Sequence, residues 1–199
     1  MNFYKKSKLI FDKFFSILFL LFSSPILLIT CFLIKIVSPG PILFSQERIG
    51  LKGKPFMLYK LRTMHVNKKL KTWSSTTTAN DPRVIKFGWF IRILKIDEFP
   101  QFLNILKGEM SIIGPRPTVK EDYDLMTEAQ KKRNQVLPGL TGLAQIKGGT
   151  KLLWPERIKY DLIYIKKKSF LLDLEIILRT ILLFLIFKIS TDPYSSKEW

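Results

Sequence analysis

Two adjacent carboxylates, Asp97 and Glu98, are the residues of this sequence best suited to chemistry. Two basic residues, Arg92 and Arg116, lie on either side of them, and Arg116 belongs to a rigid Gly-Pro-Arg-Pro turn at 114–117. A negatively charged nucleophile beside fixed positive charges and a helix N-terminus is an arrangement suited to phosphoryl transfer. Residues 92–117 are therefore the candidate site.

The acidic pair is predicted to stand at the start of a short amphipathic helix that ends at Gly108. A simpler interpretation is that Asp97 is only a helix cap, since Asp is a favoured cap residue and Pro is common at helix starts. A capping box is absent, because Pro100 occupies the position from which Glu or Gln would reach back. The acidic pair alone leaves both interpretations open.

The N-terminal part of the chain, residues 9–37, is almost entirely apolar. Phe14 to Ile34 is long enough to span a bilayer, for which about 20 apolar residues suffice. However, Ser24-Pro25 falls in the middle of this run, where Pro removes a helix hydrogen bond. Lysines and arginines occur on both flanks, which favours both ends on the cytoplasmic side. We therefore predict a re-entrant membrane helix over 1–37, broken at Ser24-Pro25, with a kinked membrane-spanning helix as the alternative.

The rest of the chain, residues 38–199, is predicted to form one small, compact catalytic domain at the cytoplasmic face. Ile42–Gly50 and Pro55–Met64 alternate in polarity as short strands do. Helices are predicted over 84–94, 119–133 and 154–167. The segment from about 170 to 187 is predicted to be an amphipathic helix in the membrane interface, with a buried core helix as the alternative. The expected fold class is α+β.

The composition limits the classes of function. The chain has 33 Lys and Arg against 16 Asp and Glu, a formal net charge of +17. Such a surface suits a polyanion, either nucleic acid or anionic lipid. A hydrophobic fraction of 47% with 16 Phe favours the membrane. The single cysteine excludes an internal disulfide, and the single histidine excludes a histidine-rich metal cluster.

Six motifs, in order along the chain, resemble those of the bacterial sugar transferases, the monotopic polyprenyl-phosphate sugar-1-phosphate transferases. The chain is similar to the minimal members, which consist of the catalytic unit alone. The motifs are Ser38–Pro41, Tyr59–Met64, Asp81–Arg83, Asp97–Gln101, Gly108–Pro117 and Pro138–Gln145. Any one of them is weak, but six in register are specific.

The resemblance implies transfer of a sugar 1-phosphate from a UDP-sugar donor to undecaprenyl phosphate, with release of UMP. This would be the first membrane step of surface glycan synthesis, at the cytoplasmic face of the bacterial inner membrane. The resemblance also implies a re-entrant helix broken at a Ser-Pro pair. Membrane lipid is an expected partner and nucleic acid is not, while a homodimer is left open.

The resemblance assigns catalytic roles to the acidic pair. Asp97 would be the nucleophile and would form a covalent aspartyl-phosphosugar. Glu98 would take a proton from the incoming polyprenyl phosphate or assist a metal site, and Asp97 and Glu98 would hold the implied cofactor, Mg²⁺. Substrate phosphates would be bound by Arg92 and Arg116 with the flanking prolines of the turn, Pro115 and Pro117. Further candidates for this basic pocket are Lys60, Arg62 and Arg83, for which a solvated basic face is the alternative.

One departure from the family concerns the donor. Gly149 stands where many members have Arg, so a contact often made by that side chain is missing. Two other functions remain as alternatives. One is a non-catalytic basic membrane adaptor that binds anionic lipid or nucleic acid, and the other is a related reaction that releases UDP or free sugar phosphate.

Overall fold

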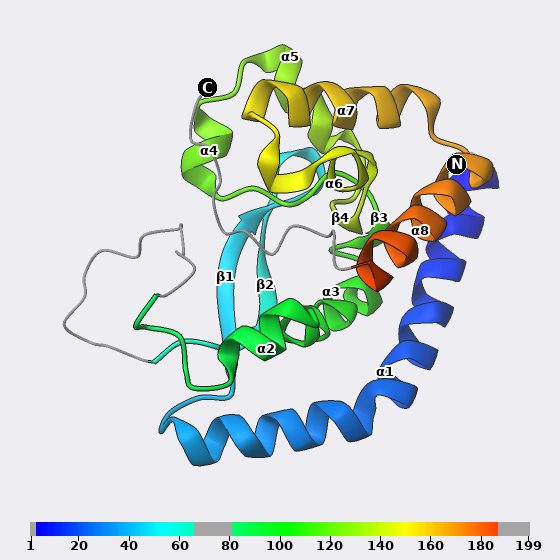
Figure 1. Cartoon of the computed structure of the whole chain (residues 1–199). Helices are drawn as coiled ribbons and strands as arrows, with labels where there is room; N and C mark the ends of the chain where they lie inside the picture. Colours follow the sequence, from blue (N-terminus) through cyan, green and yellow to red (C-terminus); the bar gives the residue numbers. More distant parts are fainter. Residues whose placement is uncertain (1–2, 66–80, 187–199) are drawn as a thin grey trace.

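The computed structural model describes residues 3–65 and 81–186, and within them the expected α+β class is confirmed. A long N-terminal helix, α1 (Phe3–Val37), runs down one side of the molecule and then along its bottom (Figure 1). An antiparallel hairpin, β1 (Leu43–Ile49) and β2 (Pro55–Leu61), follows it. A short parallel pair, β3 (Ser111–Ile113) and β4 (Gly139–Thr141), forms a second sheet.

Within 3–65 and 81–186, seven further α-helices surround the two sheets. They are α2 (Gly88–Ile93), α3 (Gln101–Lys107), α4 (Lys120–Asp124), α5 (Glu128–Lys131), α6 (Leu143–Lys147), α7 (Trp154–Lys167) and α8 (Phe170–Leu185). Short 3-10 turns also occur at Leu51–Gly53, Ile96–Glu98, Lys132–Gln135 and Gly149–Lys151.

Helix α1 bends sharply in its middle (Figure 1), and Pro25 lies inside it. A proline cannot donate the backbone hydrogen bond of its turn, and its ring pushes against the preceding turn, so a kink is the expected result. The neighbouring Ser24 hydroxyl donates to the Leu21 carbonyl at 2.7 Å. The break expected at Ser24-Pro25 is therefore a bend within one continuous helix. Re-entry into the membrane stays a prediction.

The two halves of α1 pack on either side of the segment that carries the acidic pair. Before the bend, the Phe19 ring stacks on Phe102 of α3, with centroids 4.0 Å apart. After the bend, Ile34 is fully buried in a cluster that includes Ile96. Burial of aromatic and aliphatic side chains contributes most of the packing free energy. These contacts of α1 therefore hold the acidic segment in position.

The hairpin is tied to α3 by one buried amide, that of Asn104. Its Oδ1 accepts from the Tyr59 backbone N–H at 3.1 Å, and its Nδ2 donates to the Met57 carbonyl at 2.7 Å. Nδ2 also contacts the Glu109 carboxylate at 2.7 Å. These bonds fix the register of β2 relative to α3, which brings Lys60 towards the acidic pair.

The Gly-Pro-Arg-Pro turn is held against β4 by backbone hydrogen bonds. The Gly114 N–H donates to the Thr141 carbonyl at 2.9 Å, and the Gly139 N–H donates to the Pro115 carbonyl at 2.9 Å. A Cβ at Gly139 would collide with the Gly114 backbone. The two glycines allow the two backbones to approach closely, so the turn that carries Arg116 has a fixed position.

Two sequence predictions about helices were wrong. Residues 119–133 form not one helix but α4, α5 and a 3-10 turn, because Thr127 starts a new helix with a capping box to Gln130. Between 84 and 94, only Gly88–Ile93 is α-helical. The helix predicted at 154–167 is confirmed with the same bounds, and the hairpin is confirmed as well.

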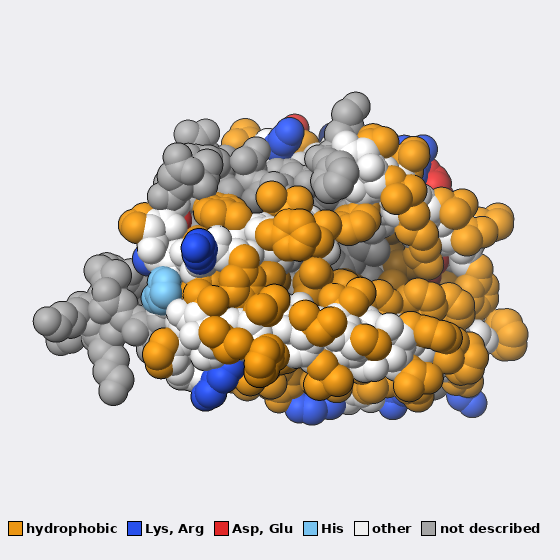
Figure 2. Space-filling model, turned by 60° about the horizontal axis from the view of Figure 1, so that its bottom comes forward, with side chains coloured by type: hydrophobic (Ala, Val, Ile, Leu, Met, Phe, Trp, Pro, Cys, Tyr) orange, Lys and Arg blue, Asp and Glu red, His pale blue; other side chains and the backbone are white. Residues whose placement is uncertain are grey.

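The underside of the molecule is apolar. Hydrophobic side chains cover the face formed by α1, with lysines and arginines at its edges (Figure 2). Phe22 and Leu28, on either side of the bend, are 77% and 71% exposed. Among the described residues, α1 is the one helix long and apolar enough to cross a membrane. A surface of this size and character is compatible with a membrane location.

Candidate active site

The acidic pair lies in the 3-10 turn Ile96–Glu98, and α3 begins only at Gln101. The expectation that the pair starts the helix is therefore wrong. Pro100 is the residue at the helix cap, and no side chain caps the helix. The turn is entered through Lys95, which has a left-handed conformation at φ 56°. A non-glycine residue in this conformation is strained, and such strain concentrates at functional sites.

Asp97 is the unusual member of the pair. Its side chain is buried, and its Oδ1 atom has no hydrogen-bond partner within the described residues. Buried polar atoms are nearly always paired, so an unpaired carboxylate oxygen indicates a site for a ligand. Burial raises the pKa of Asp97, and the charge of Glu98 acts in the same direction, while Lys60 opposes them.

Glu98 has the opposite electrostatic environment. Burial disfavours its charged form, but Arg116, Lys60 and Lys95 outweigh this effect and hold its pKa well below the usual range. Arg116 Nη2 contacts Glu98 Oε1 at 2.7 Å, and Lys60 Nζ contacts the same oxygen at 3.1 Å. A proton added to the pair would therefore reside on Asp97, while Glu98 stays ionised.

Three of the predicted basic residues surround the pair. Arg116 and Lys60 bind Glu98 directly, and Arg116 remains 45% exposed, so that a substrate can still reach it. Arg92 donates from Nε to the Thr63 hydroxyl at 2.9 Å, and its charge acts on Asp97. Burial lowers the pKa of Arg92.

The other predicted binding residues make different contacts. Arg62 is buried and donates to the carbonyls of Ser38 and Pro39, which ties the end of α1 to β2. Arg83 forms a forked pair with Asp81, with a shortest distance of 2.6 Å.

The two prolines of the turn contribute backbone carbonyls to contacts that hold it. Pro115 accepts from Gly139, and Pro117 accepts from Arg48 at 3.5 Å. Their proposed role in substrate binding stays a prediction.

Two basic residues near the site were missed by the sequence analysis. Lys95 acts on both acids, and burial lowers its own pKa. Arg48, on β1, reaches the turn at Pro117. The position of Lys95 two residues before Asp97 could have drawn attention to it, but nothing in the strand pattern distinguishes Arg48 from a solvated residue.

The residues present fit the implied Mg²⁺. No group of three or more potential ligands of the His, Cys, Asp and Glu types lies within the described ranges. Mg²⁺ commonly binds through one or two carboxylates together with substrate phosphates and water. The unpaired Oδ1 atom of Asp97 suits such a site, whereas the Glu98 oxygens already contact Arg116 and Lys60.

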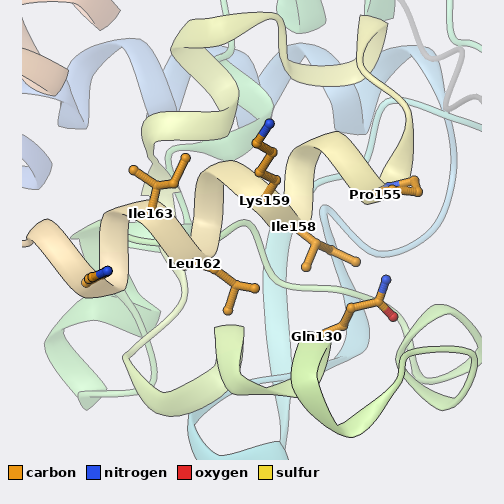
Figure 3. A pocket seen from close by; sticks show the side chains of 7 residues that line it. Gln130, Pro155, Ile158, Lys159, Leu162 and Ile163 are labelled. Atoms are coloured by element: carbon orange, nitrogen blue, oxygen red, sulfur yellow. The ribbon is translucent and has the colours of Figure 1, made fainter.

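A shallow groove elsewhere on the molecule contains none of the predicted site residues. It lies along α7, where Ile158 and Leu162 project towards Gln130 of α5 (Figure 3). Its lining is mainly apolar, with Lys159 and Lys166 at its edge. The candidate active site is therefore the acidic pair with its basic neighbours.

Comparison with known families finds a match over most of the chain. Residues 3–186 match the family described as bacterial sugar transferase, and the chain belongs to this family. It is 41% identical over 174 residues to an uncharacterized sugar transferase, EpsL, of Bacillus subtilis, covering 87% of this chain and 85% of that protein. The resemblance seen in the sequence motifs is confirmed.

Several relatives have names that state a reaction. One is the UDP-glucose:undecaprenyl-phosphate glucose-1-phosphate transferase of Escherichia coli, 41% identical over 172 residues, which cover 82% of this chain but 37% of that protein. The protein with the same name in Caulobacter vibrioides is 44% identical over 166 residues, covering 79% of this chain and 62% of that protein. The match to these relatives thus spans only part of their length.

Proposed function

We propose that this protein transfers a sugar 1-phosphate from a UDP-sugar to undecaprenyl phosphate and releases UMP. The observation that carries the proposal is the buried Asp97 carboxylate, whose Oδ1 atom has no partner among the described residues. It lies beside Glu98, which contacts the side chains of Lys60 and Arg116. Family membership and the names of the relatives support the same reaction.

In the first step, an Asp97 oxygen would attack the phosphorus that carries the sugar. The bond between this phosphorus and the bridging oxygen of the diphosphate would break, and UMP would leave with that oxygen. A covalent aspartyl-phosphosugar would remain. A carboxylate needs no general base to be nucleophilic, but burial raises the pKa of Asp97, so nearby cations are required to keep it ionised. Lys60, Lys95 and Arg92 provide that charge.

In the second step, a phosphate oxygen of undecaprenyl phosphate would attack the same phosphorus. The bond to Asp97 would break, which restores the free carboxylate and gives a lipid-linked diphosphate sugar. Glu98 is a weak proton acceptor for this step, because a general base works best with a pKa near the operating pH and that of Glu98 is much lower. Its role would be to hold Arg116 and Lys60 and to assist the metal site.

Mg²⁺ would be held by the unpaired Oδ1 atom of Asp97, with Glu98 assisting beside it while it contacts Arg116 and Lys60. The ion would supply positive charge to offset the repulsion between the acidic pair and the diphosphate. Arg116, which retains considerable exposure, would bind phosphate oxygens through its planar guanidinium group.

Gly149 stands at the position where many family members have an arginine. It has φ +57° and open space around it, so no side chain occupies that position here.

The apolar underside supports a monotopic location at the cytoplasmic face of the bacterial inner membrane. The bend of α1 would let both of its ends return to the same face, and α8 would lie in the interface. Leu171, Leu178 and Leu185 of α8 are well exposed, while Ile176 is fully buried in the core. In this position the acidic pair would lie close to the lipid that carries the acceptor phosphate.

The test is UMP release by detergent-solubilised protein supplied with undecaprenyl phosphate, Mg²⁺ and a panel of UDP-sugars. Wild-type protein should release UMP with one or two of the sugars, and Asp97→Asn should abolish turnover while membrane association is retained. Full activity of Asp97→Asn would refute the role of Asp97 as nucleophile. Release of UDP or free sugar phosphate would indicate a related reaction, and the absence of any product would favour a non-catalytic membrane adaptor.

A further inference from the structure

Arg48, which no part of the proposed mechanism uses, lies beside the Gly-Pro-Arg-Pro turn. The end of β1 is bridged to the segment after the turn, since the Ile49 N–H donates to the Thr118 carbonyl at 2.8 Å. This bridge places the Arg48 guanidinium against Pro117, whose carbonyl accepts from Nη1 at 3.5 Å. Arg48 thus comes from 69 residues away to contact Pro117, the residue that follows Arg116 in the turn.

The charge of Arg48 is poorly compensated. Its Nη2 donates to the Gln46 side chain at 2.7 Å, and its buried Nε atom has no hydrogen-bond partner in the part of the chain that the structure describes. Within the described residues, no carboxylate lies within 4.0 Å of it, unlike Arg83, Arg116 and Arg133. A partly buried cation without a carboxylate partner is costly, which indicates that an anion binds there during function.

Nearby positive charges strengthen the need for an anion at Arg48. Burial lowers its pKa to about 10, and Arg116 acts in the same direction, while Asp122, Glu98 and Glu121 oppose them. Burial also lowers the pKa of Arg157 on α7, and the charge of Arg116 acts in the same direction. The Arg157 guanidinium donates to two backbone carbonyls, those of Leu152 and Thr150. Arg116 therefore repels both Arg48 and Arg157, and a bound phosphate would relieve this repulsion.

We propose that Arg48 is a further phosphate-binding residue, which acts with Arg116 to hold a phosphate group of a substrate. The proposal rests on the proposed function, which supplies two phosphate-bearing substrates, the nucleoside diphosphate sugar and the polyprenyl phosphate. A guanidinium suits either, since it offers parallel N–H donors to two phosphate oxygens. Arg48 is only partly buried, so a ligand can reach it.

The test compares wild-type protein with Arg48→Gln, Arg48→Lys and a control, Lys54→Gln. The control removes one positive charge from an exposed position of the same hairpin. UMP release is measured while the UDP-sugar and undecaprenyl phosphate are varied in turn. Loss of one charge-assisted hydrogen bond should raise KM for one substrate about tenfold in Arg48→Gln. We expect kcat to change less, and Arg48→Lys to recover part of the loss.

The substrate whose KM rises identifies the source of the phosphate. If neither KM differs from that of Lys54→Gln, or if only thermal stability falls, Arg48 has a structural role and the proposal is overturned.

A second measurement separates this proposal from the proposed function. Thermal unfolding with and without inorganic pyrophosphate should show stabilisation of wild-type protein and of Lys54→Gln, and a smaller effect on Arg48→Gln. If wild-type protein releases no UMP but binds pyrophosphate in this Arg48-dependent way, the reaction is refuted and the phosphate site stands. If pyrophosphate stabilises all the variants equally, or none of them, the phosphate site is refuted even when UMP is released.

Discussion

The strongest electrostatic contact of the candidate site is that between Arg116 and Glu98, and Arg116→Gln tests it. Arg116 Nη2 contacts Oε1 at 2.7 Å, and Nη1 contacts Oε2 at the long distance of 3.4 Å. One full charge-assisted hydrogen bond is therefore lost. Lys60 still contacts Oε1 at 3.1 Å, and Arg116 is half exposed, so the loss should lie near the lower end of the usual range. The loss of this contact should cost about 1.5 kcal/mol of folding free energy. Because Arg116 would also bind phosphate, the loss of a charge-assisted hydrogen bond of similar strength to the substrate should lower kcat/KM roughly tenfold.

The pH dependence provides the more specific readout. Arg116 is the largest of the influences that lower the pKa of Glu98, so its removal raises that pKa. Arg116 also interacts favourably with ionised Asp97, so its removal should raise the pKa of Asp97 as well. Because the Asp97 carboxylate must be ionised to attack, the acid limb of kcat/KM should move to higher pH. Arg116→Lys keeps the charge and should move the limb less. An acid limb that stays at its wild-type position in Arg116→Gln would refute the electrostatic coupling of Arg116 to Asp97.

Stability gives an independent check with a defined sign. Because the pKa of Glu98 is lowered on folding, its ionised form stabilises the protein above the unfolded pKa of about 4.3. That contribution is lost as the pH falls through the folded value. Thermal unfolding in detergent should therefore show Arg116→Gln less stable than wild type at neutral pH, with a difference that shrinks as the solution is acidified. A difference that grows on acidification would contradict the assignment.

Three further outcomes are expected for other residues. Asn104→Leu should destabilise the protein by about 1–3 kcal/mol in thermal unfolding, because it leaves buried backbone groups of β2 unpaired. Asp161→Asn should lower the free energy of unfolding by about 3–5 kcal/mol, because it leaves the equally buried Arg133, 2.6 Å away, without its counter-charge. The double variant Arg133→Met with Asp161→Leu should recover most of that stability. Lys95→Gly should change the free energy of unfolding by less than about 1 kcal/mol. The glycine relieves the strain of the left-handed conformation, and this gain offsets the greater conformational entropy of the unfolded chain. UMP release should nevertheless fall. A fully active Lys95→Gly protein would exclude Lys95 from the site.

Local chemistry made much of the fold predictable from the sequence. The alternation of residues 42–64 defined the hairpin, and Pro25 within an apolar run indicated a bend in the first helix. The segment 119–133 was predicted wrongly, because its helical composition continues through Thr127 although that residue can also cap a new helix. Composition does not decide between continuing a helix and starting one, since the choice depends on how the flanking residues pack.

The sequence by itself determined which residues could do chemistry at this site, the acidic pair and the arginines near it. The tertiary structure alone decided which basic residues meet the acids. Lys60, 38 residues before Glu98, binds it, while Arg62, two residues further on, donates instead to the Pro39 carbonyl and holds the end of α1. The structure also separated the pKa values of Asp97 and Glu98. The physical reason is that burial and charge depend on neighbours brought together by long-range packing, whereas sequence patterns report on residues close along the chain.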